Sequence, residues 1–229
     1  MNYKFRTLFW YGFLLVASFS TLWACSPVPA QLDTAPPDLK PAHSEKSSPQ
    51  VIELRTLISD LLTDIRYATA NNFTGQVLYE SDSPYLVREA AESLVVVQNE
   101  LKALGLQLLV FDGYRPLSVQ KKMWTVFPDN RYVANPANGS RHNRGCAIDL
   151  ALADSSGNPL EMPTDYDDFT EKAHASYMDL PAQQVANRAL LKVVMEKHGF
   201  TGLRTEWWHF DFQGWRQYPL LDIPIPAQE

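Results

Sequence analysis

Two short segments of the chain contain the side chains that a hydrolytic metal site requires. Residues 140–149 supply His142 and Asp149, and residues 206–209 supply the carboxylate of Glu206 and the imidazole of His209. A catalytic zinc ion takes three nitrogen or oxygen ligands and keeps a fourth position open for water, so His142, Asp149 and His209 would complete its protein ligands. Glu206 would then lie beside the water as its general base.

The spacing of His142 and Asp149 predicts a turn between them. An odd number of positions separates the two residues, so on one continuous strand their side chains would face opposite sides. Gly139 precedes this segment and Gly145 lies within it, and glycine tolerates the positive φ angle of a tight reversal. We therefore expect the chain to turn before Asp149 enters a strand.

Glu206 and His209 raise a similar question. Residues three apart share a face on a helix but not on a regular strand. The aromatic residues of the segment 207–212 favour a strand, so we predict a bulge or a strong twist near Trp207. A regular strand that pointed Glu206 away from the metal would exclude it as the base.

Three helices and three strands are predicted to position these segments. Apolar residues recur at helical spacing in the first helix, and Pro116 and Pro181 open the other two. The strands are rich in β-branched residues, leucine or aromatic residues. The predicted helices are residues 87–104, 116–127 and 181–198, and the predicted strands are residues 107–111, 146–152 and 206–212. This order favours an α+β domain with helices on one face of a small, largely antiparallel sheet.

The first 25 residues have the pattern of an export signal. Lys4 and Arg6 precede an apolar run at residues 8–19, which is too short for a comfortable membrane span. The Leu-Trp-Ala-Cys ending at residues 22–25 resembles a lipobox, in which the signal is cut before a cysteine that becomes lipid-modified. We predict a signal peptide at residues 1–24 and a lipid anchor on Cys25. The alternatives are an ordinary signal peptide with an incidental cysteine and a retained transmembrane anchor.

The composition beyond Cys25 predicts a tether followed by one domain. Residues 25–50 are rich in Pro, Ser, Ala, Lys and Asp with few large apolar residues, which is typical of a disordered tether. Residues 51–229 suit a single catalytic domain. Ser26 stands where an aspartate is associated with retention in the inner membrane of Gram-negative bacteria, so we expect an outer-membrane anchor facing the periplasm.

Charge and cysteine content exclude some classes of function. The net charge is −6, and loss of Lys4 and Arg6 with the signal peptide would remove two positive charges to give −8. An acidic protein without a basic surplus is not expected to bind nucleic acid. With Cys25 lipidated, Cys146 is the only remaining thiol, which excludes an intramolecular disulfide. Cys146 is expected to be a small buried residue rather than a metal ligand.

The motifs together carry a family resemblance. Ser-x-His-x-x-Gly-x-Ala-x-Asp at residues 140–149, followed by Glu-x-x-His at 206–209, resembles the zinc D,D-peptidases, whose fold is shared with the Hedgehog signalling domain. Residues 64–75, Asp-Ile-Arg-Tyr-Ala-Thr-Ala-Asn-Asn-Phe-Thr-Gly, and residues 111–116, Phe-Asp-Gly-Tyr-Arg-Pro, are similar to the D-alanyl-D-alanine dipeptidases of the VanX type. The resemblance runs from about residue 51 to the end, and it implies zinc-dependent hydrolysis of a small dipeptide.

The resemblance also implies roles for individual residues. His142, Asp149 and His209 match the ligands of one zinc ion per chain, and Glu206 matches the general base that later acts as acid. Arg115 matches an arginine that stabilises the transition state. The simpler interpretation of Arg115 is that it braces the loop before the second helix.

Two further residues are matched to substrate binding. Asp167 is similar to an aspartate that holds the free amino group of the substrate, with Asp168 as a rival, and Ser140 matches a serine that contacts the substrate. A solvated acidic loop is the simpler interpretation for Asp167.

Two other functions remain open at this point. One is a D,D-carboxypeptidase that acts on the stem peptides of peptidoglycan. The other is a zinc-containing binding module without catalysis, against which Glu206 and Arg115 argue. An exported dipeptidase would act on dipeptides released by cell-wall turnover rather than on the cytoplasmic wall precursor.

Overall fold

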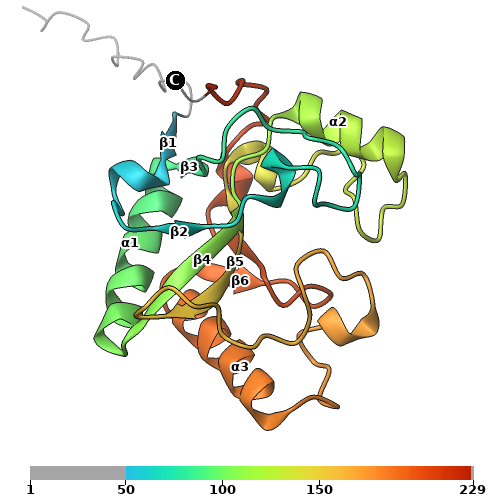
Figure 1. Ribbon diagram of the computed structural model, residues 1–229. Coiled ribbons are helices and arrows are strands. Elements are labelled where there is room, and N and C mark those ends of the chain that lie inside the picture. Colours follow the sequence, from blue (N-terminus) through green and yellow to red (C-terminus); the bar gives the residue numbers. More distant parts are fainter. Residues whose placement is uncertain (1–49, 228–229) are drawn as a thin grey trace, which may run out of the picture. The chain divides into compact units, whose positions relative to one another are not determined.

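The computed structural model describes residues 50–227 of the 229-residue chain (Figure 1). The predicted signal peptide, the lipidation site Cys25 and all of the predicted tether except Gln50 lie outside the described residues. Within residues 50–227, none of the helices combines the length and the apolar character needed to cross a membrane.

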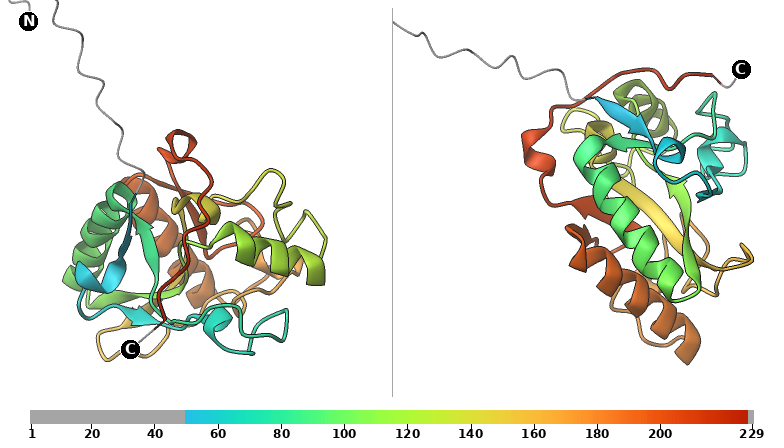
Figure 2. Two further views of the ribbon diagram at one scale, coloured as in Figure 1. Left: turned by 90° about the horizontal axis from the view of Figure 1, so that it is seen from above. Right: turned by 90° about the vertical axis from the view of Figure 1, so that its left-hand side faces the viewer.

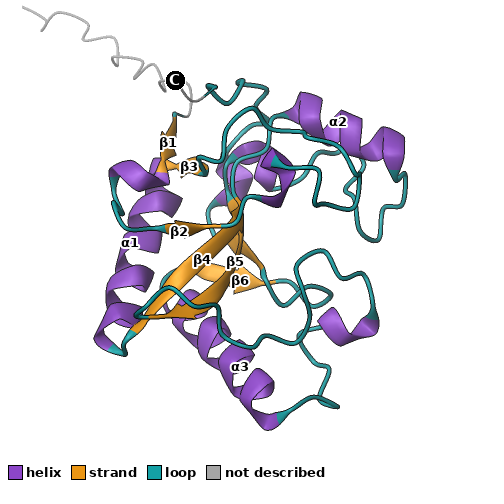
Figure 3. Ribbon diagram, in the orientation of Figure 1, coloured by secondary structure: helices purple, strands orange, loops and turns teal. Residues whose placement is uncertain are grey.

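A five-stranded sheet forms the centre of the described domain, in the order β2-β4-β5-β7-β6 (Figure 3). Its strands are β2 (Leu62–Thr63), β4 (Leu106–Asp112), β5 (Ala147–Asp154), β6 (Phe200–Gly202) and β7 (His209–Phe212). Only β2 runs parallel to its neighbour, so the prediction of a largely antiparallel sheet is confirmed. A separate antiparallel pair joins β1 (Val51–Glu53) to β3 (Tyr85–Val87).

Two of the three helices pack against this sheet. Helix α1 (Arg88–Ala103) lies on β4, and α3 (Ala182–Lys197) lies beside α1 and packs on β5 and β6 (Figure 2). The buried residues of α1 recur three or four positions apart, as one face of a helix requires. The buried Gln98 on that face accepts a hydrogen bond from the backbone of Leu108, which ties α1 to β4.

Helix α2 (Leu117–Val126) is an exception to the prediction that the helices cover one face of the sheet. It lies apart from α1 and α3 (Figure 2). The buried face of α2 carries Gln120 and Met123, and these side chains meet Arg115 and a cavity rather than the sheet. The proline at its start thus identifies the helix but not the surface that its apolar face covers.

The central strands are buried on both faces. All residues of β5 except Asp154 are buried. On the side of the loops, Tyr166 stacks on Phe111 of β4 with ring centroids 4.8 Å apart and meets Trp208 edge-on at 5.5 Å. These rings explain why the apolar run of β5 does not alternate with polar residues.

The predicted boundaries hold for the helices and for β4 and β5, but the prediction for the last strand is wrong in its first half. Residues 206–208 form a turn, and β7 begins only at His209. The backbone N–H of Trp207 donates to Ala173 O, and its indole N–H donates to Thr164 Oγ1 at 2.9 Å. These bonds anchor the turn outside the sheet. The bulge falls instead in β4, between Val110 and Asp112.

Short 3-10 turns connect several of these elements. They span Leu54–Thr56, Arg66–Ala68, His142–Arg144, Glu171–Ala173 and Trp215–Gln217.

Candidate active site

The register of three neighbouring strands brings distant polar residues to one level of the sheet. Asp112 on β4 is paired with Asp149 on β5, and Asp149 is paired with His209 on β7. Side chains directly opposite each other on antiparallel strands have Cβ atoms about 5 Å apart. Asp149 and His209 therefore meet although the chain places 60 positions between them.

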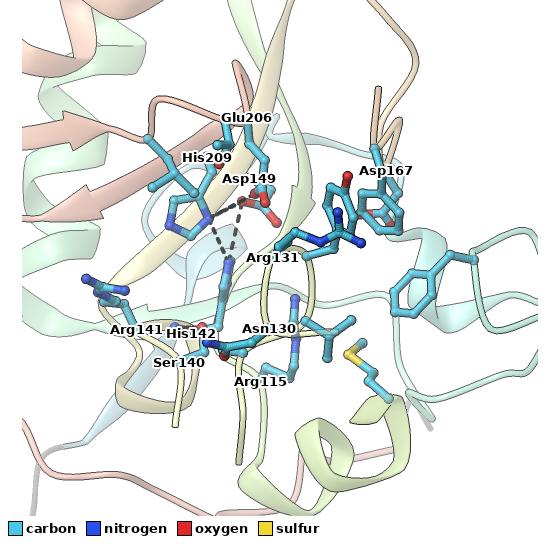
Figure 4. Close-up of a pocket in the computed structure, with 18 of the residues that line it drawn as sticks. Arg115, Asn130, Arg131, Ser140, Arg141, His142, Asp149, Asp167, Glu206 and His209 are labelled. Atoms are coloured by element: carbon cyan, nitrogen blue, oxygen red, sulfur yellow. Dashed lines mark hydrogen bonds and ion pairs between the residues drawn. The ribbon is translucent and has the colours of Figure 1, made fainter. Parts of the chain in front are cut away.

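His142 reaches the same point from a turn before β5. It begins the 3-10 turn His142–Arg144, and Gly145 then adopts a left-handed conformation with φ of 65°. This arrangement confirms the predicted turn between His142 and Asp149. The Nε2 atom of His142 lies 3.2 Å from His209 Nδ1 and 3.4 Å from Asp149 Oδ1, and the last two atoms are 2.9 Å apart (Figure 4).

The outer hydrogen-bond partners of the two imidazoles allow each ring to direct a lone pair toward the centre of the site. His142 Nδ1 lies 2.7 Å from the carbonyl oxygen of Gly113 and must donate its proton there. His209 Nε2 donates in the same way to Asp211 Oδ1 at 2.9 Å. His142 Nε2, His209 Nδ1 and Asp149 Oδ1 consequently face one another as three electron-pair donors within 4.8 Å.

This set of atoms fits a zinc ion. Ligand atoms about 2.0–2.2 Å from a tetrahedral zinc ion lie about 3.3 Å apart, close to the spacing found here. Three facing lone pairs repel one another unless a proton or a metal cation lies between them. Two imidazoles and one carboxylate leave a fourth position open, as in catalytic sites.

The pKa values of the same groups show that the site favours a positive charge at its centre. Burial lowers the pKa of His209, but hydrogen bonds to Asp149 and Asp211 outweigh it and raise that pKa well above its ordinary value. Burial raises the pKa of Asp149, whereas His142 and His209 bring it far below its ordinary value. A proton therefore competes with a metal ion for the centre of the site.

Glu206 lies beside this centre because of the turn that precedes β7. Its Oε2 atom is 3.9 Å from His209 Nδ1, and its side chain is only 16% exposed. Burial raises the pKa of Glu206, and the nearby His209 offsets part of that rise. A carboxylate with a raised pKa is a stronger base, which suits proton transfer near neutral pH.

Arg115 is held rigidly next to the site. Its guanidinium donates twice to the buried Asp112, at 2.6 and 3.1 Å, and once to Gln120 Oε1 at 2.9 Å. It also lies 5.2 Å from the ring centroid of Tyr67. Burial lowers the pKa of Arg115, but Asp112 raises it well above its ordinary value, so the charge is retained.

Asp167 lies on a loop that approaches the site from the opposite side to Arg141 (Figure 4). It is the one non-glycine residue with positive φ, 60°, in the part of the chain that the structure describes. Tyr67 donates a hydrogen bond to its carboxylate at 2.9 Å. Burial and the charge of Asp149 raise the pKa of Asp167 to about 8. The rival Asp168 instead accepts a hydrogen bond from the backbone of Thr170.

A single cavity of about 380 Å³ joins these groups. Its lining includes seven residues singled out in the sequence: Arg115, Ser140, His142, Asp149, Asp167, Glu206 and His209. Ser140 is buried, and its hydroxyl accepts a hydrogen bond from the backbone of His142. Cys146 is buried and outside the ligand cluster, as expected, and burial raises the pKa of its thiol to about 12.

Comparison with known proteins identifies the family to which this chain belongs. The family model described as D-ala-D-ala dipeptidase matches residues 47–222. The chain belongs to the D-Ala-D-Ala dipeptidase family. The family resemblance seen in the motifs is therefore confirmed, and the chain is assigned to a family of peptidases.

Relatives in this family cover most of the chain. The D-alanyl-D-alanine dipeptidase of Escherichia coli (strain K12) is 37% identical over 172 residues, covering 75% of this chain and 89% of the relative. That of Enterococcus faecalis (strain ATCC 700802 / V583) is 32% identical over 184 residues, covering 71% and 87%. A solved structure of the D,D-dipeptidase VanXYg with a D-Ala-D-Ala phosphinate analog matches with a TM-score of 0.38 and 19% identity, covering 72% of this chain and 67% of that chain.

Four polar residues around the candidate active site were given no role in the sequence analysis. Asp112 fixes Arg115, Tyr67 binds Asp167, Tyr166 donates to Asp149 Oδ2 at 2.8 Å, and Asp211 accepts from His209. Asp112 and Tyr67 lie inside the segments that carry the resemblance, so their position in the sequence could have indicated that they lie near the site. Asp211 follows two residues after His209, on the same face of a strand. For Tyr166, the sequence gives no indication of such a role other than its position next to Asp167.

Proposed function

We propose that this protein is a zinc-dependent dipeptidase that hydrolyses D-alanyl-D-alanine or a closely related dipeptide. The observation that carries the proposal is the set of three facing donor atoms, from His142, Asp149 and His209, in a cavity that also holds Glu206. The substrate class is supported by relatives that bear the name D-alanyl-D-alanine dipeptidase.

In the proposed chemistry, the metal activates the substrate carbonyl and the water, and Glu206 transfers the proton. When bound, zinc polarises the scissile carbonyl and lowers the pKa of the attacking water toward about 7. Glu206 accepts the proton of that water and delivers it to the leaving amine. Its buried position supports this role, because desolvation raises the pKa of the carboxyl group above that of an exposed glutamate and so brings it closer to neutral pH.

Arg115 stabilises the charge that develops during the reaction. Negative charge builds on the carbonyl oxygen of the substrate in the transition state. The guanidinium already has its orientation fixed by Asp112 and Gln120, so little reorganisation is needed when that charge appears.

Asp167 and Ser140 are the residues of the cavity that bind the polar groups of the substrate. Asp167 places a carboxyl group at the cavity wall, and the ammonium group of a free dipeptide beside it would favour the ionised form of that group. Ser140 lines the same cavity and presents a hydroxyl near His142. A site that recognises a free amino terminus favours a dipeptide over the end of a longer chain.

Substrate length provides the test of this function. The full-length protein, solubilised in detergent and supplied with zinc, is assayed against D-Ala-D-Ala, L-Ala-L-Ala and a pentapeptide that ends in D-Ala-D-Ala. We expect turnover of D-Ala-D-Ala, loss of activity with a chelator and recovery with one zinc ion per chain. Turnover of the pentapeptide without turnover of the dipeptide would overturn the proposal in favour of a D,D-carboxypeptidase.

We also propose that the enzyme is exported and anchored by a lipid on Cys25, facing the periplasm and favouring the outer membrane. This proposal rests on the apolar run and the lipobox-like residues 22–25. Labelled palmitate should enter the wild-type protein and not a Cys25→Ser variant, and fractionation should move that variant out of the membrane. Labelling of both proteins, or of neither, would contradict the anchor.

A further inference from the structure

His209 lies between two carboxylates. Its Nδ1 atom faces Asp149 Oδ1 at 2.9 Å, and its Nε2 atom donates to Asp211 Oδ1 at 2.9 Å. Asp211 is on β7, two residues after His209, and the period of a strand places both side chains on one face. The Asp211 side chain is only 15% exposed, so water competes little for this bond.

The other imidazole is oriented by a weaker acceptor. His142 Nδ1 donates to the neutral backbone carbonyl of Gly113 at 2.7 Å. The carboxylate oxygen near it, Asp112 Oδ2, lies farther away at 3.6 Å and is already paired with Arg115. A carboxylate on the far nitrogen makes an imidazole more basic than a carbonyl does and fixes its ring orientation and tautomer. His209 is therefore the imidazole with the stronger outer support.

Asp211 is itself held in place by Arg141. The Arg141 Nε atom forms an ion pair with Asp211 Oδ2 at 3.4 Å. The guanidinium of Arg141 also lies 4.8 Å from the ring centroid of Trp215, in the 3-10 turn that follows β7. Figure 4 shows Arg141 on the His209 side of the ligand cluster, away from Asp167.

We propose that Asp211 is a positioning residue for the metal centre, and that Arg141 and Trp215 hold it in its working orientation. Asp211 keeps the proton of His209 on Nε2, which leaves the Nδ1 lone pair directed at the metal. This inference rests on the proposed zinc site, since it assigns a function to a residue that acts through one of its ligands.

Zinc affinity tests the inference independently of catalysis. Competition with a chromophoric chelator gives the zinc dissociation constant of the full-length wild type, Asp211→Ala, Asp211→Asn and Arg141→Ala. Because loss of an outer partner typically weakens metal binding about 10–100-fold, we expect that loss for Asp211→Ala. Asp211→Asn keeps a hydrogen-bond acceptor without the charge, so its zinc affinity should lie between those of the wild type and Asp211→Ala. The zinc affinity of Arg141→Ala should fall a few-fold.

Arg216→Ala is the matched control. Arg216 also stacks on Trp215, with 4.5 Å from its guanidinium carbon to the ring centroid, but it has no ion pair with Asp211. It should bind zinc as the wild type does. The visible spectrum of the cobalt-substituted protein provides a second readout, which should change in the Asp211 variants and not in Arg216→Ala.

The possible results separate the two levels of the proposal. Wild-type zinc affinity in Asp211→Ala and Asp211→Asn, with an unchanged cobalt spectrum, would overturn the role of Asp211. A wild-type protein that binds neither zinc nor cobalt would overturn the proposed function itself. If Asp211→Ala does not fold by circular dichroism, Asp211→Asn and Arg141→Ala decide the question, and wild-type affinity in both would overturn it.

Discussion

Carboxylates in and behind the cavity wall differ in their surroundings, and those surroundings separate their roles. Asp112 is fully buried and neutralised by Arg115, while Asp149 faces two imidazoles. Glu206 lies near His209 without a close hydrogen bond, and burial raises its pKa. Of these three carboxylates, Glu206 is therefore the one suited to exchange a proton during the reaction.

Replacement of Glu206 by glutamine should remove the base and leave the metal site intact. We expect kcat for D-Ala-D-Ala to fall about 10²–10⁴-fold, the usual contribution of a general base. KM and zinc content should stay near wild type, because the amide has the same shape. Steady-state kinetics and metal analysis check this, with the exposed Glu92→Gln as control. Wild-type kcat in Glu206→Gln would rule out the proposed base.

Asp167 should make the stability of the metal-free protein depend on pH. Its pKa is about 8 in the folded protein, above the ordinary value of 3.8, so the folded state binds its proton more tightly than the unfolded state. This stabilisation is complete below about pH 4 and is lost as pH rises through about 8.

Comparison with Asp167→Asn isolates that contribution. Between pH 4 and 9 the free energy of unfolding of the wild type should fall by about 1–3 kcal/mol relative to the variant, a value reduced for partial exposure of the side chain. Urea denaturation in the presence of a chelator measures both proteins. Parallel pH profiles for the two would show that Asp167 is ionised throughout.

At the scale of elements, the turn into β5 decides whether His142 reaches Asp149. Gly145 has φ of 65°, and a Cβ atom there would lie 3.0 Å from Val51 Cγ1 and 3.1 Å from the backbone nitrogen of Val87. A side chain at this position would meet both left-handed backbone strain and the β1–β3 pair.

Gly145→Ala should therefore lose both stability and zinc affinity. Gly105→Ala is the matched control, because Gly105 has φ of 72° and a methyl group added there would have no heavy atom of another segment within 4 Å. We expect about 1 kcal/mol of destabilisation for Gly105→Ala from strain alone, and about 1–3 kcal/mol more for Gly145→Ala. Urea denaturation and zinc titration measure both effects. Equal destabilisation with unchanged zinc affinity would show that the turn tolerates a side chain.

For the whole described domain, local patterns predicted the three helices, β4, β5 and part of β7, but neither the short strands β1, β2, β3 and β6 nor how the elements meet. The helical spacing in α1 and the apolar run of β5 identify these elements, and the types of His142, Asp149 and His209 suffice to suggest a metal site. The pairing of Asp149 with His209 depends on the register between β5 and β7, which is a long-range property.

Tertiary contacts also explain the two errors. The bonds of Trp207 to Ala173 and Thr164 pull the start of the last segment out of the sheet, although aromatic residues favour a strand there. Helix α2 does not join the helices on the sheet, and its first turn instead donates backbone hydrogen bonds from Leu117 to Leu221 O and from Ser118 to Asp222 Oδ1. In both cases a contact with a distant part of the chain outweighs local preference.

The stability of the whole protein should depend on zinc, because the three ligands come from two distant segments of the chain and meet only in the folded state. An ion that binds only the folded protein stabilises it by about 4 kcal/mol at 1,000 times its dissociation constant. We expect Tm to rise with zinc in the wild type and in His174→Ala, whose histidine is outside the cluster, and not in His142→Ala.

This rise in Tm should shrink as pH falls. Hydrogen bonds to Asp149 and Asp211 raise the pKa of His209 in the metal-free protein, so a proton occupies its imidazole over a wider acid range. Zinc must displace that proton, and the effective affinity therefore drops at lower pH. Calorimetric scans with and without zinc between pH 5 and 8 measure the effect. A zinc-induced shift of equal size across this range would mean that His209 is not a ligand.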